Sequence, residues 1–299
     1  MFPTNRRQFL RTSANTALVS AVAMSLGKRL MASDEAAPDV KINHSVCKWC
    51  YPKVPLKDLC TAGKEFGLQS IELLGPKQAK VAQEMGLTCA LITNPTVKTK
   101  HGKLGGISKA WNRVEHHEAL LKVYEQRIIE TKDLGLNNVI CFSGNRAGLD
   151  DEQGMKNCAE GLKKLMPIAE KHGVTITMEL LNSKKNHKDY MCDRTDWGVG
   201  LCELVGSERF KLLYDIYHMQ IMEGDVITTI KKIKDSVSHY HTGGVPGRAE
   251  IDDTQELNYP AIMRAIQSTG YKGYVAQEFI PKRDDKVASL KQAIGICTI

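Results

Sequence analysis

Short apolar segments alternate with longer amphipathic segments along most of this chain. Eight apolar segments are five to seven residues long and read "INHSVCK", "QSIELL", "LTCALI", "NNVICF", "VTITMEL", "KLLYD", "SVSHYHT" and "GYVAQEF". The segments between them, such as "LKDLCTAGKEFG" and "MKNCAEGLKKLMPIAEKHG", carry apolar residues at helical spacing. One strand-like and one helical segment together take about 30 residues, a pattern typical of repeated βα units.

Glycines mark the ends of three helical segments. Gly67, Gly135 and Gly173 each stand where a helix C-cap is expected, just before the next apolar segment. Nearly continuous apolar strands indicate a parallel sheet that is covered on both faces. Eight strands in about 260 residues favour a closed (β/α)8 TIM barrel, a single α/β domain, over a doubly wound sheet.

The N-terminal segment has a different composition. "TNRRQFLRTSANTALVSAVAMSLGKRLMA" holds a twin arginine and then a weakly apolar run rich in Ala and Ser, and it resembles a twin-arginine export signal. We therefore expect a signal peptide over 1–32, a linker over 33–39, the TIM-barrel catalytic domain over 40–299, and delivery to the periplasm. A basic amphipathic helix is the alternative. No later segment is long and apolar enough to span a bilayer, so we expect no stable membrane association after signal cleavage.

The formal net charge of +7 says little about the folded domain. Five of these charges lie in residues 1–32, which contain no acidic residue, so a surplus of two is left for the rest. This does not support a nucleic-acid partner. We expect a small-molecule substrate, and the sequence leaves open whether the chain forms a homo-oligomer.

Four consecutive predicted strands end in a carboxylate or an imidazole: Glu179, Asp215, His241 and Glu278. In a parallel barrel these ends share one rim, the carboxyl-terminal face, where the chemistry of such barrels lies. Each residue alone has a structural explanation as a cap, a core histidine or an ion-pair partner. Together they predict a metal site, because crowded carboxylates repel unless a cation neutralises them. This donor set suits one divalent ion, Mn²⁺, Mg²⁺ or Co²⁺, and is also compatible with Zn²⁺.

The sequence "CKWC" follows the first predicted strand. Cys47 and Cys50 would suit a redox pair or half of a metal site, and the alternative is that they only close the strand. The nine cysteines are odd in number and show no small disulfide framework, so they do not define a redox compartment.

The segments "MELLN", "YDIYHMQIMEGD", "HTGGVPGR" and "GYKGYVAQEFIP" carry a family resemblance. They resemble the hydroxypyruvate isomerase branch of the xylose-isomerase-like TIM-barrel superfamily, which also contains the ketose 3-epimerases. The resemblance spans roughly residues 40–295. It implies a divalent metal held by the four strand-end residues and proton transfer beside a carbonyl through a cis-enediolate.

The resemblance also implies roles for single residues. Glu179 and Glu278 would be catalytic, removing and returning the α-proton from opposite sides of the substrate. His218 and Arg248 would bind the substrate, and Trp49 would either form an apolar wall for it or simply pack. His239 shares a strand face with His241 and is expected one layer deeper, behind the metal ligands.

Two features depart from the family patterns. Hydroxypyruvate isomerases tend to have Gln at the metal-ligand position of the seventh strand. This chain has His241 there, and the epimerases also have His. The epimerases have an acidic residue in the loop after "MELLN", where this chain has the basic "SKKNHKDY". Such a loop suits an electron-rich substrate, although solvated lysines are the common alternative. The long segment after the third strand, "NPTVKTKHGKLGGISKAWNRVEHH", is expected to be a lid or a specificity element.

These observations favour an exported, metal-dependent isomerase or epimerase of a small hydroxy-carbonyl compound, a sugar or a hydroxypyruvate-like acid. A lyase or hydratase acting on 3-keto-glycosides would use the same metal and glutamates. The product distinguishes the two, because isomerisation conserves the mass of the substrate and elimination does not. A non-catalytic periplasmic sugar-binding barrel is the alternative from another class, and a paired base argues against it. A metal-dependent endonuclease would need more histidines and a more basic surface.

Overall fold

The computed structural model describes residues 41–299. The predicted signal peptide over 1–32 and the linker over 33–39 lie outside the described residues, so both stay predictions. The described residues belong to one compact unit. Among them, no helix is both long and apolar enough to cross a membrane.

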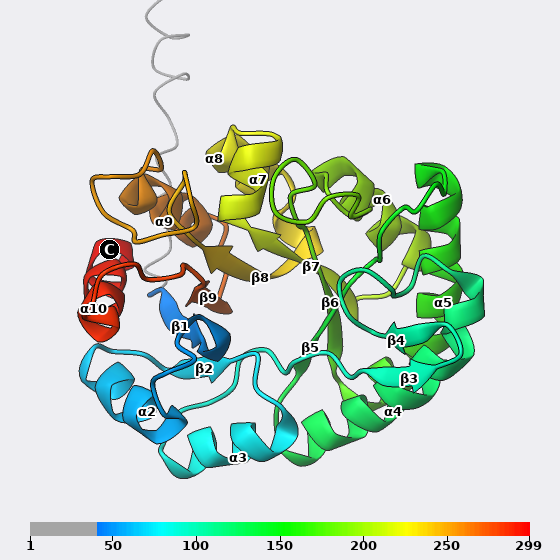
Figure 1. The fold of residues 1–299 in the computed structure, drawn as a ribbon, viewed down its shortest axis with the longest axis horizontal. Helices are drawn as coiled ribbons and strands as arrows, with labels where there is room; N and C mark the ends of the chain where they lie inside the picture. Colours follow the sequence, from blue (N-terminus) through cyan, green and yellow to red (C-terminus); the bar gives the residue numbers. More distant parts are fainter. Residues whose placement is uncertain (1–40) are drawn as a thin grey trace, which may run out of the picture. The chain divides into compact units, whose positions relative to one another are not determined.

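A curled, all-parallel sheet forms the centre of the fold (Figure 1). Its neighbouring strands follow the order β2-β1-β9-β8-β7-β6-β5. The strands are β1 (Asn43–Cys47), β2 (Ser70–Glu72), β5 (Asn138–Cys141), β6 (Thr175–Glu179), β7 (Phe210–Asp215), β8 (Val237–Thr242) and β9 (Tyr274–Gln277). The expected TIM barrel is confirmed, with seven continuous strands where the sequence predicts eight.

The missing strand is the third predicted one, "LTCALI". It lies between β2 and β5 and closes the barrel through single bridges, Ser70 to Thr88 on one side and Ile92 to Val139 on the other. Side chains interrupt the regular ladder here: the Ala90 N–H donates to Ser70 Oγ (2.8 Å) and its carbonyl accepts from the Asn138 side chain (3.1 Å). The segment therefore holds a strand's position without a strand's hydrogen-bond pattern.

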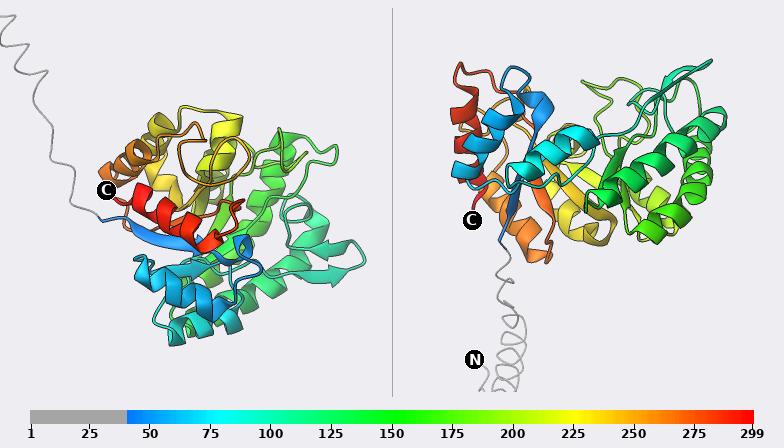
Figure 2. Two further views of the ribbon diagram at one scale, coloured as in Figure 1. Left: turned by 60° about the vertical axis from the view of Figure 1, so that its left-hand side comes forward. Right: turned by 90° about the horizontal axis from the view of Figure 1, so that it is seen from below.

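Helices surround the sheet in the views of Figures 1 and 2. They are α2 (Leu56–Glu65), α3 (Pro76–Glu84), α4 (His117–Asp133), α5 (Asp151–His172), α6 (Thr195–Val205), α7 (Ile216–Met222), α8 (Val226–Lys232), α9 (Tyr259–Ser268) and α10 (Lys286–Cys297), with the 3₁₀ turns η1 (Lys48–Cys50), η2 (Val114–His116) and η3 (Lys234–Ser236). Gly67, Gly135 and Gly173 follow α2, α4 and α5 with φ of 88°, 70° and 67°, which confirms the predicted left-handed caps.

The long segment after the third predicted strand contains structure that its composition did not predict. It forms the antiparallel hairpin β3 (Val97–Thr99) and β4 (Gly102–Leu104), at the periphery of the barrel in Figure 2. Trp111, at its far end, is fully buried against Tyr124 and His117. This end of the segment is therefore part of the core. Its predicted role as a lid or specificity element is untested.

An irregularity between β7 and β8 sets the register of the site. The pairing of Leu212 with Val237 is followed by Leu213 with His239, so one residue of β8 is skipped. Beyond this bulge Asp215 pairs directly with His241. Without the shift Asp215 would stand opposite Tyr240, whose side chain alternates to the other face of the sheet.

Candidate active site

Glu179, Asp215, His241 and Glu278 converge at the carboxyl-terminal ends of β6, β7, β8 and β9. One ligand atom from each lies within 4.8 Å of the others, and all four residues are buried. His241 Nδ1 is the central atom, 2.8 Å from Glu278 Oε2 and 3.5 Å from Glu179 Oε1. The structure therefore brings together the four residues predicted to bind a metal.

Asp215 has two functions that the sequence offered as alternatives. It is the N-cap of α7, where its Oδ1 accepts the His218 backbone N–H at 2.9 Å. Its Oδ2 faces the cluster, 3.4 Å from Arg248 and 3.7 Å from His218 Nε2. One oxygen thus anchors the helix while the other is available to a ligand.

The three carboxyl groups differ in their electrostatic surroundings. Burial raises the pKa of Asp215 to about 8, against the opposing charge of Arg248. Burial and the charge of Glu278 also raise the pKa of Glu179. Burial alone would raise the pKa of Glu278, but His241 and Arg248 outweigh it and hold that pKa well below its usual range. Glu278 is therefore the carboxylate most readily ionised at neutral pH.

The donor set fits a divalent cation. Glu179 Oε1 and His218 Nε2 are buried polar atoms without a hydrogen-bond partner among the described residues. Such atoms are costly to bury unless a ligand satisfies them. Three carboxylates and one imidazole nitrogen can coordinate Mn²⁺, Mg²⁺, Co²⁺ or Zn²⁺. The residues able to hold the expected metal are thus Glu179, Asp215, His241 and Glu278.

Arg248, predicted to bind substrate, lies against the acidic cluster. Its guanidinium forms ion pairs with Glu278 and Asp215, and its Nε donates to the Glu278 carbonyl at 3.2 Å. The guanidinium carbon lies 5.2 Å from the Trp49 ring centroid and 5.4 Å from that of Tyr217. The residue has φ of 53°, a left-handed conformation uncommon for an arginine. Packing and ion pairs hold this backbone and fix the charge at the site.

His218, also predicted to bind substrate, has its Nδ1 occupied. That atom accepts the Asn182 backbone N–H at 3.2 Å and lies 2.7 Å from the Asn182 side-chain nitrogen. Burial and the charge of Arg248 lower the pKa of His218 well below its usual range, so the ring is neutral. Because Nδ1 accepts, the proton is on Nε2, which lies on the side of Asp215. This N–H can donate to an oxygen of a bound molecule.

Trp49 and the two glutamates line a cavity of about 430 Å³. Trp49 is 43% exposed, and its Nε1 donates to Glu278 Oε1 at 2.7 Å. The apolar lining of the cavity consists of Leu73, Ile107, Ile140, Phe142 and Leu181. Of the two roles left open for Trp49, this geometry favours a wall of the cavity, with an additional hydrogen bond to a predicted catalytic group.

The basic loop after β6 is only partly directed at the cavity. The Lys184 ammonium donates to the carbonyls of Ile221 and Met222, at 3.2 and 2.8 Å, near the C-terminal end of α7. It therefore neutralises that helix end. Lys185 is exposed. His187 does line the cavity and contacts the His218 ring at a centroid distance of 5.2 Å.

The sequence reasoning missed Glu72, the last residue of β2. Glu72 is fully buried, and its Oε1 lies 2.8 Å from His239 Nε2 and 2.9 Å from His241 Nε2. Burial alone would raise the pKa of Glu72, but the two histidines outweigh it and lower that pKa to about 2. A lone acidic residue inside the apolar segment "QSIELL" was the available signal, because a buried carboxylate needs a partner.

The "CKWC" cysteines are buried free thiols at the end of β1 and in η1. Burial raises the pKa of both Cys47 and Cys50, so neither is a reactive thiolate. Cys47 Sγ lies 3.7 Å from His241 Nε2. The structure does not pair them in a disulfide, and the alternative that they close the first strand fits their position.

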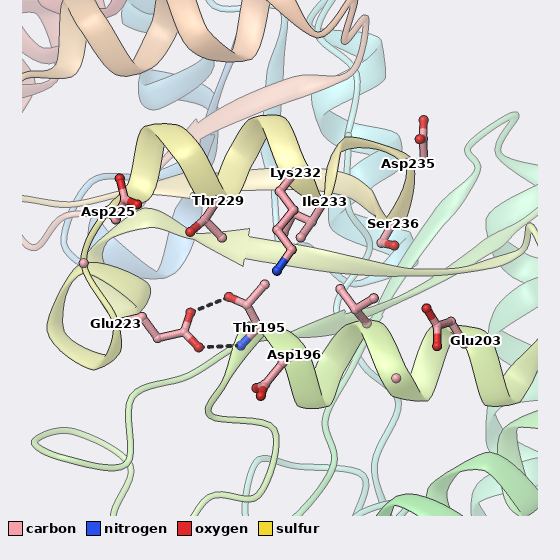
Figure 3. A pocket seen from close by; sticks show the side chains of 13 residues that line it. Thr195, Asp196, Glu203, Glu223, Asp225, Thr229, Lys232, Ile233, Asp235 and Ser236 are labelled. Atoms are coloured by element: carbon pink, nitrogen blue, oxygen red, sulfur yellow. Dashed lines mark hydrogen bonds between the residues drawn. The ribbon is translucent and has the colours of Figure 1, made fainter.

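A further cavity of about 640 Å³ lies outside the barrel, between α6 and the α8–η3 segment (Figure 3). Carboxylates and Lys232 line it, and it contains none of the predicted site residues. Glu223 there accepts the Thr195 backbone N–H at 2.9 Å and so caps α6. The chemistry expected from the sequence is concentrated in the smaller cavity.

Comparison with known proteins is consistent with this geometry. The chain is 25% identical over 248 residues to a putative hydroxypyruvate isomerase of Homo sapiens, covering 79% of this chain and 88% of that protein. It is 36% identical over 123 residues to a 2-oxo-tetronate isomerase of Cupriavidus necator, covering 41% and 46%. A solved structure described as AP endonuclease, family 2, from Brucella melitensis has the same fold, with a TM-score of 0.71 and 24% identity over 84% of this chain and 96% of that one. The family model of the xylose isomerase-like TIM barrel matches residues 64–296, and this chain belongs to that family.

Proposed function

We propose that this protein is a divalent-metal-dependent isomerase or epimerase of a small hydroxy-carbonyl compound. The observation that carries the proposal is that Glu179 and Glu278 place carboxylate oxygens 3.5 and 2.8 Å from His241 Nδ1 and line one cavity large enough for a sugar-sized molecule. Two carboxylates that face one small volume can remove a proton from one side of a carbon and return one from the other.

The two glutamates have different environments, which supports a division of labour. Glu278 is ionised and is held in place by Trp49 Nε1 and Arg248, so it can accept the α-proton first. Glu179 has a raised pKa and an oxygen that accepts no hydrogen bond from the described part of the chain, so it can deliver a proton. Reaction in the other direction would exchange these roles.

The remaining residues hold the substrate. His218 Nε2–H donates to a substrate oxygen, and the charge of Arg248 attracts a carboxylate or an oxyanion. Trp49 and the apolar wall exclude water from the reacting carbon. A divalent ion held by the four strand-end residues would polarise the carbonyl and hydroxyl oxygens and so make the α-proton more acidic.

The substrate class follows from the relatives and from the charge of the site. Hydroxypyruvate and 2-oxo-tetronate, named for two relatives, are both keto acids with a neighbouring hydroxyl group. A keto acid of this kind would present its carboxylate to Arg248 and its oxygens to the metal. We therefore expect short hydroxy-keto acids or ketoses to be turned over.

Elimination on a 3-keto-glycoside is a second candidate, and the shape of the cavity supports it. The active-site cavity continues into a second one of about 570 Å³, and both are lined by Thr93, Asn94, Ile107 and Phe142. This extension offers room for a leaving group beyond the reacting ring. The same proton abstraction would then be followed by loss of that group.

Proton exchange with solvent tests the proposal. Protein purified without chelator and loaded with Mn²⁺ is incubated in deuterated water with hydroxypyruvate, other hydroxy-keto acids, ketoses and 3-keto-glycosides. We expect deuterium at the carbon beside the carbonyl and a product of unchanged skeleton, detected by mass spectrometry. A product that lacks its leaving group would establish the elimination. Glu203→Gln, an exposed carboxylate of the outer cavity, is the control and should exchange normally. Metal-loaded protein that binds these compounds without exchange would refute the isomerase.

A further inference from the structure

Glu72 is a buried carboxylate that the proposed chemistry does not use. It is the last residue of β2, on the opposite side of His241 from the acidic cluster, and its side chain is fully buried. Its Oε1 lies within hydrogen-bond distance of two imidazole nitrogens, His239 Nε2 at 2.8 Å and His241 Nε2 at 2.9 Å. Burying a charge in such a position costs free energy, which its hydrogen-bond partners must offset.

The contact determines which nitrogen of His241 faces the cluster. A carboxylate only accepts hydrogen bonds, so His241 Nε2 carries a hydrogen and donates it to Glu72. The other nitrogen, Nδ1, points at Glu278 Oε2 and Glu179 Oε1. An imidazole that binds a cation is neutral and keeps one N–H; with that N–H on Nε2, the lone pair of Nδ1 is directed at the volume that the carboxylates share.

We propose that Glu72 is a positioning residue for the metal centre: its hydrogen bond to His241 Nε2 fixes the tautomer and orientation in which Nδ1 binds the cation. This rests on the metal centre of the proposed function. His239, which shares the same oxygen, holds the Glu72 carboxylate in place from the side away from the cluster. Glu72 does not touch the ion or the substrate and acts through His241 alone.

A second metal ion is the competing explanation for this group. Cys47, Glu72 and His241 offer ligand atoms within 4.8 Å of one another. However, Glu72 Oε1 lies only 2.8 and 2.9 Å from the two Nε2 atoms. These are hydrogen-bond lengths. This group also offers one carboxylate among three donors, whereas the cluster at the strand ends offers three carboxylates among four donors. Cys47 Sγ, at 3.7 Å from His241 Nε2, is a neighbour of this pair.

Metal affinity is the direct test, measured by competition with a chromophoric chelator. Glu72→Gln keeps the size of the side chain and removes the charge, so we expect Mn²⁺ and Co²⁺ to bind about 10- to 100-fold more weakly. The visible spectrum of the Co²⁺ protein should also change, because the imidazole is no longer held in one orientation. Cys47→Ala is the matched control: it removes a neighbour of both Glu72 and His241 without removing their hydrogen bond, and its affinity should equal wild type.

A double-mutant cycle separates positioning from general damage. Because Glu72 acts through His241, Glu72→Gln should cost little further affinity in a His241→Gln background. An equal loss of affinity in both backgrounds would overturn the proposal. If Glu72→Gln does not fold, long-range ¹H–¹⁵N spectra of the wild-type metal protein replace it: a proton on His241 Nε2 is expected, and a proton on Nδ1 would refute the inference.

The outcomes distinguish this inference from the proposed function. A wild-type protein that binds no divalent ion would refute both. A wild-type protein that binds one ion, with a Glu72→Gln variant of equal affinity, would refute only the role of Glu72. Two ions in wild type and one in Cys47→Ala would replace the hydrogen bond with a second metal site.

Discussion

The two ends of the barrel use polar groups for different purposes. At the amino-terminal end of β1, the Asn43 side chain donates to the Lys272 carbonyl at 3.0 Å, and His44 Nε2 lies 2.9 Å from Thr298 Oγ1. These are neutral groups that join β1 to the C-terminal part of the chain. At the carboxyl-terminal end, acidic groups gather around His241, and the buried Glu179 Oε1 has no hydrogen-bond partner within residues 41–299.

The two ends therefore differ in the electrostatic free energy that it costs to bury their polar groups. A hydrogen bond between neutral groups at the amino-terminal end only needs to balance its own desolvation. Burial and, to a smaller extent, the neighbouring carboxylates disfavour ionisation at the other end, where both raise the pKa of Asp215 and of Glu179. Such an arrangement is stable only with compensating cations, and it concentrates reactivity at one face of the barrel.

The largest expected effect is at the carboxyl-terminal end. If Glu278 were only a ligand, Glu278→Gln would weaken metal binding and activity would return at high metal concentration, because the amide oxygen can still coordinate. If Glu278 is also the base, the metal-loaded variant should stay about 10²–10⁴-fold slower in turnover and in α-proton exchange. Metal content by elemental analysis and exchange by NMR separate the two. Wild-type exchange in the metal-loaded variant would show that Glu278 is not the base.

A second prediction concerns the amino-terminal end and changes stability, not activity. Burial, with the charge of Lys41, lowers the pKa of His44 from 6.5 to about 4. The unfolded chain binds this proton from about pH 6.5 and the folded chain only near pH 4, so stability falls as the pH falls through this window, by up to about 3 kcal/mol. Urea unfolding from pH 7 to pH 4 should show a shallower decline for His44→Gln. Identical slopes would contradict this assignment.

The smallest of these effects is expected at Arg248. Arg248→Lys keeps a positive charge but loses the planar guanidinium that contacts Asp215, Glu278 and the Trp49 ring together. We expect KM for a keto acid to rise about tenfold with metal content unchanged, the effect of one weakened charged hydrogen bond. Steady-state kinetics on metal-loaded protein would measure it. A fall in kcat at unchanged KM would instead place Arg248 in the chemical step.

Much of the site was predictable because strand ends are visible in a sequence. In a parallel barrel every strand points the same way, so a polar residue that ends an apolar segment must lie on the common rim. Glu179, Asp215, His241 and Glu278 all satisfy this rule. The caps at Gly67, Gly135 and Gly173 were predictable for a similar reason, because only local backbone conformation is involved.

Other features needed the folded chain because they join segments that no local pattern relates. Glu72 ends β2, and its partner His241, in β8, lies 169 residues away in the sequence. The closing segment 87–92 reads as a strand, yet Ser70 and Asn138 bind the backbone of Ala90 and interrupt its ladder. Hydrogen bonds of this kind depend on which side chains meet in space.

The sequence by itself therefore determined the barrel, the order of its strands along the chain and the four residues at its carboxyl-terminal rim, because alternation, strand direction and capping are local properties. Tertiary structure alone decided that β8 skips Ser238 in its pairing with β7, which places Asp215 opposite His241. It also decided that Arg248 forms ion pairs with two carboxylates and that Glu72 contacts His241 Nε2. Register, loop path and side-chain partners result from the packing of the whole molecule, since each is selected by contacts between distant segments.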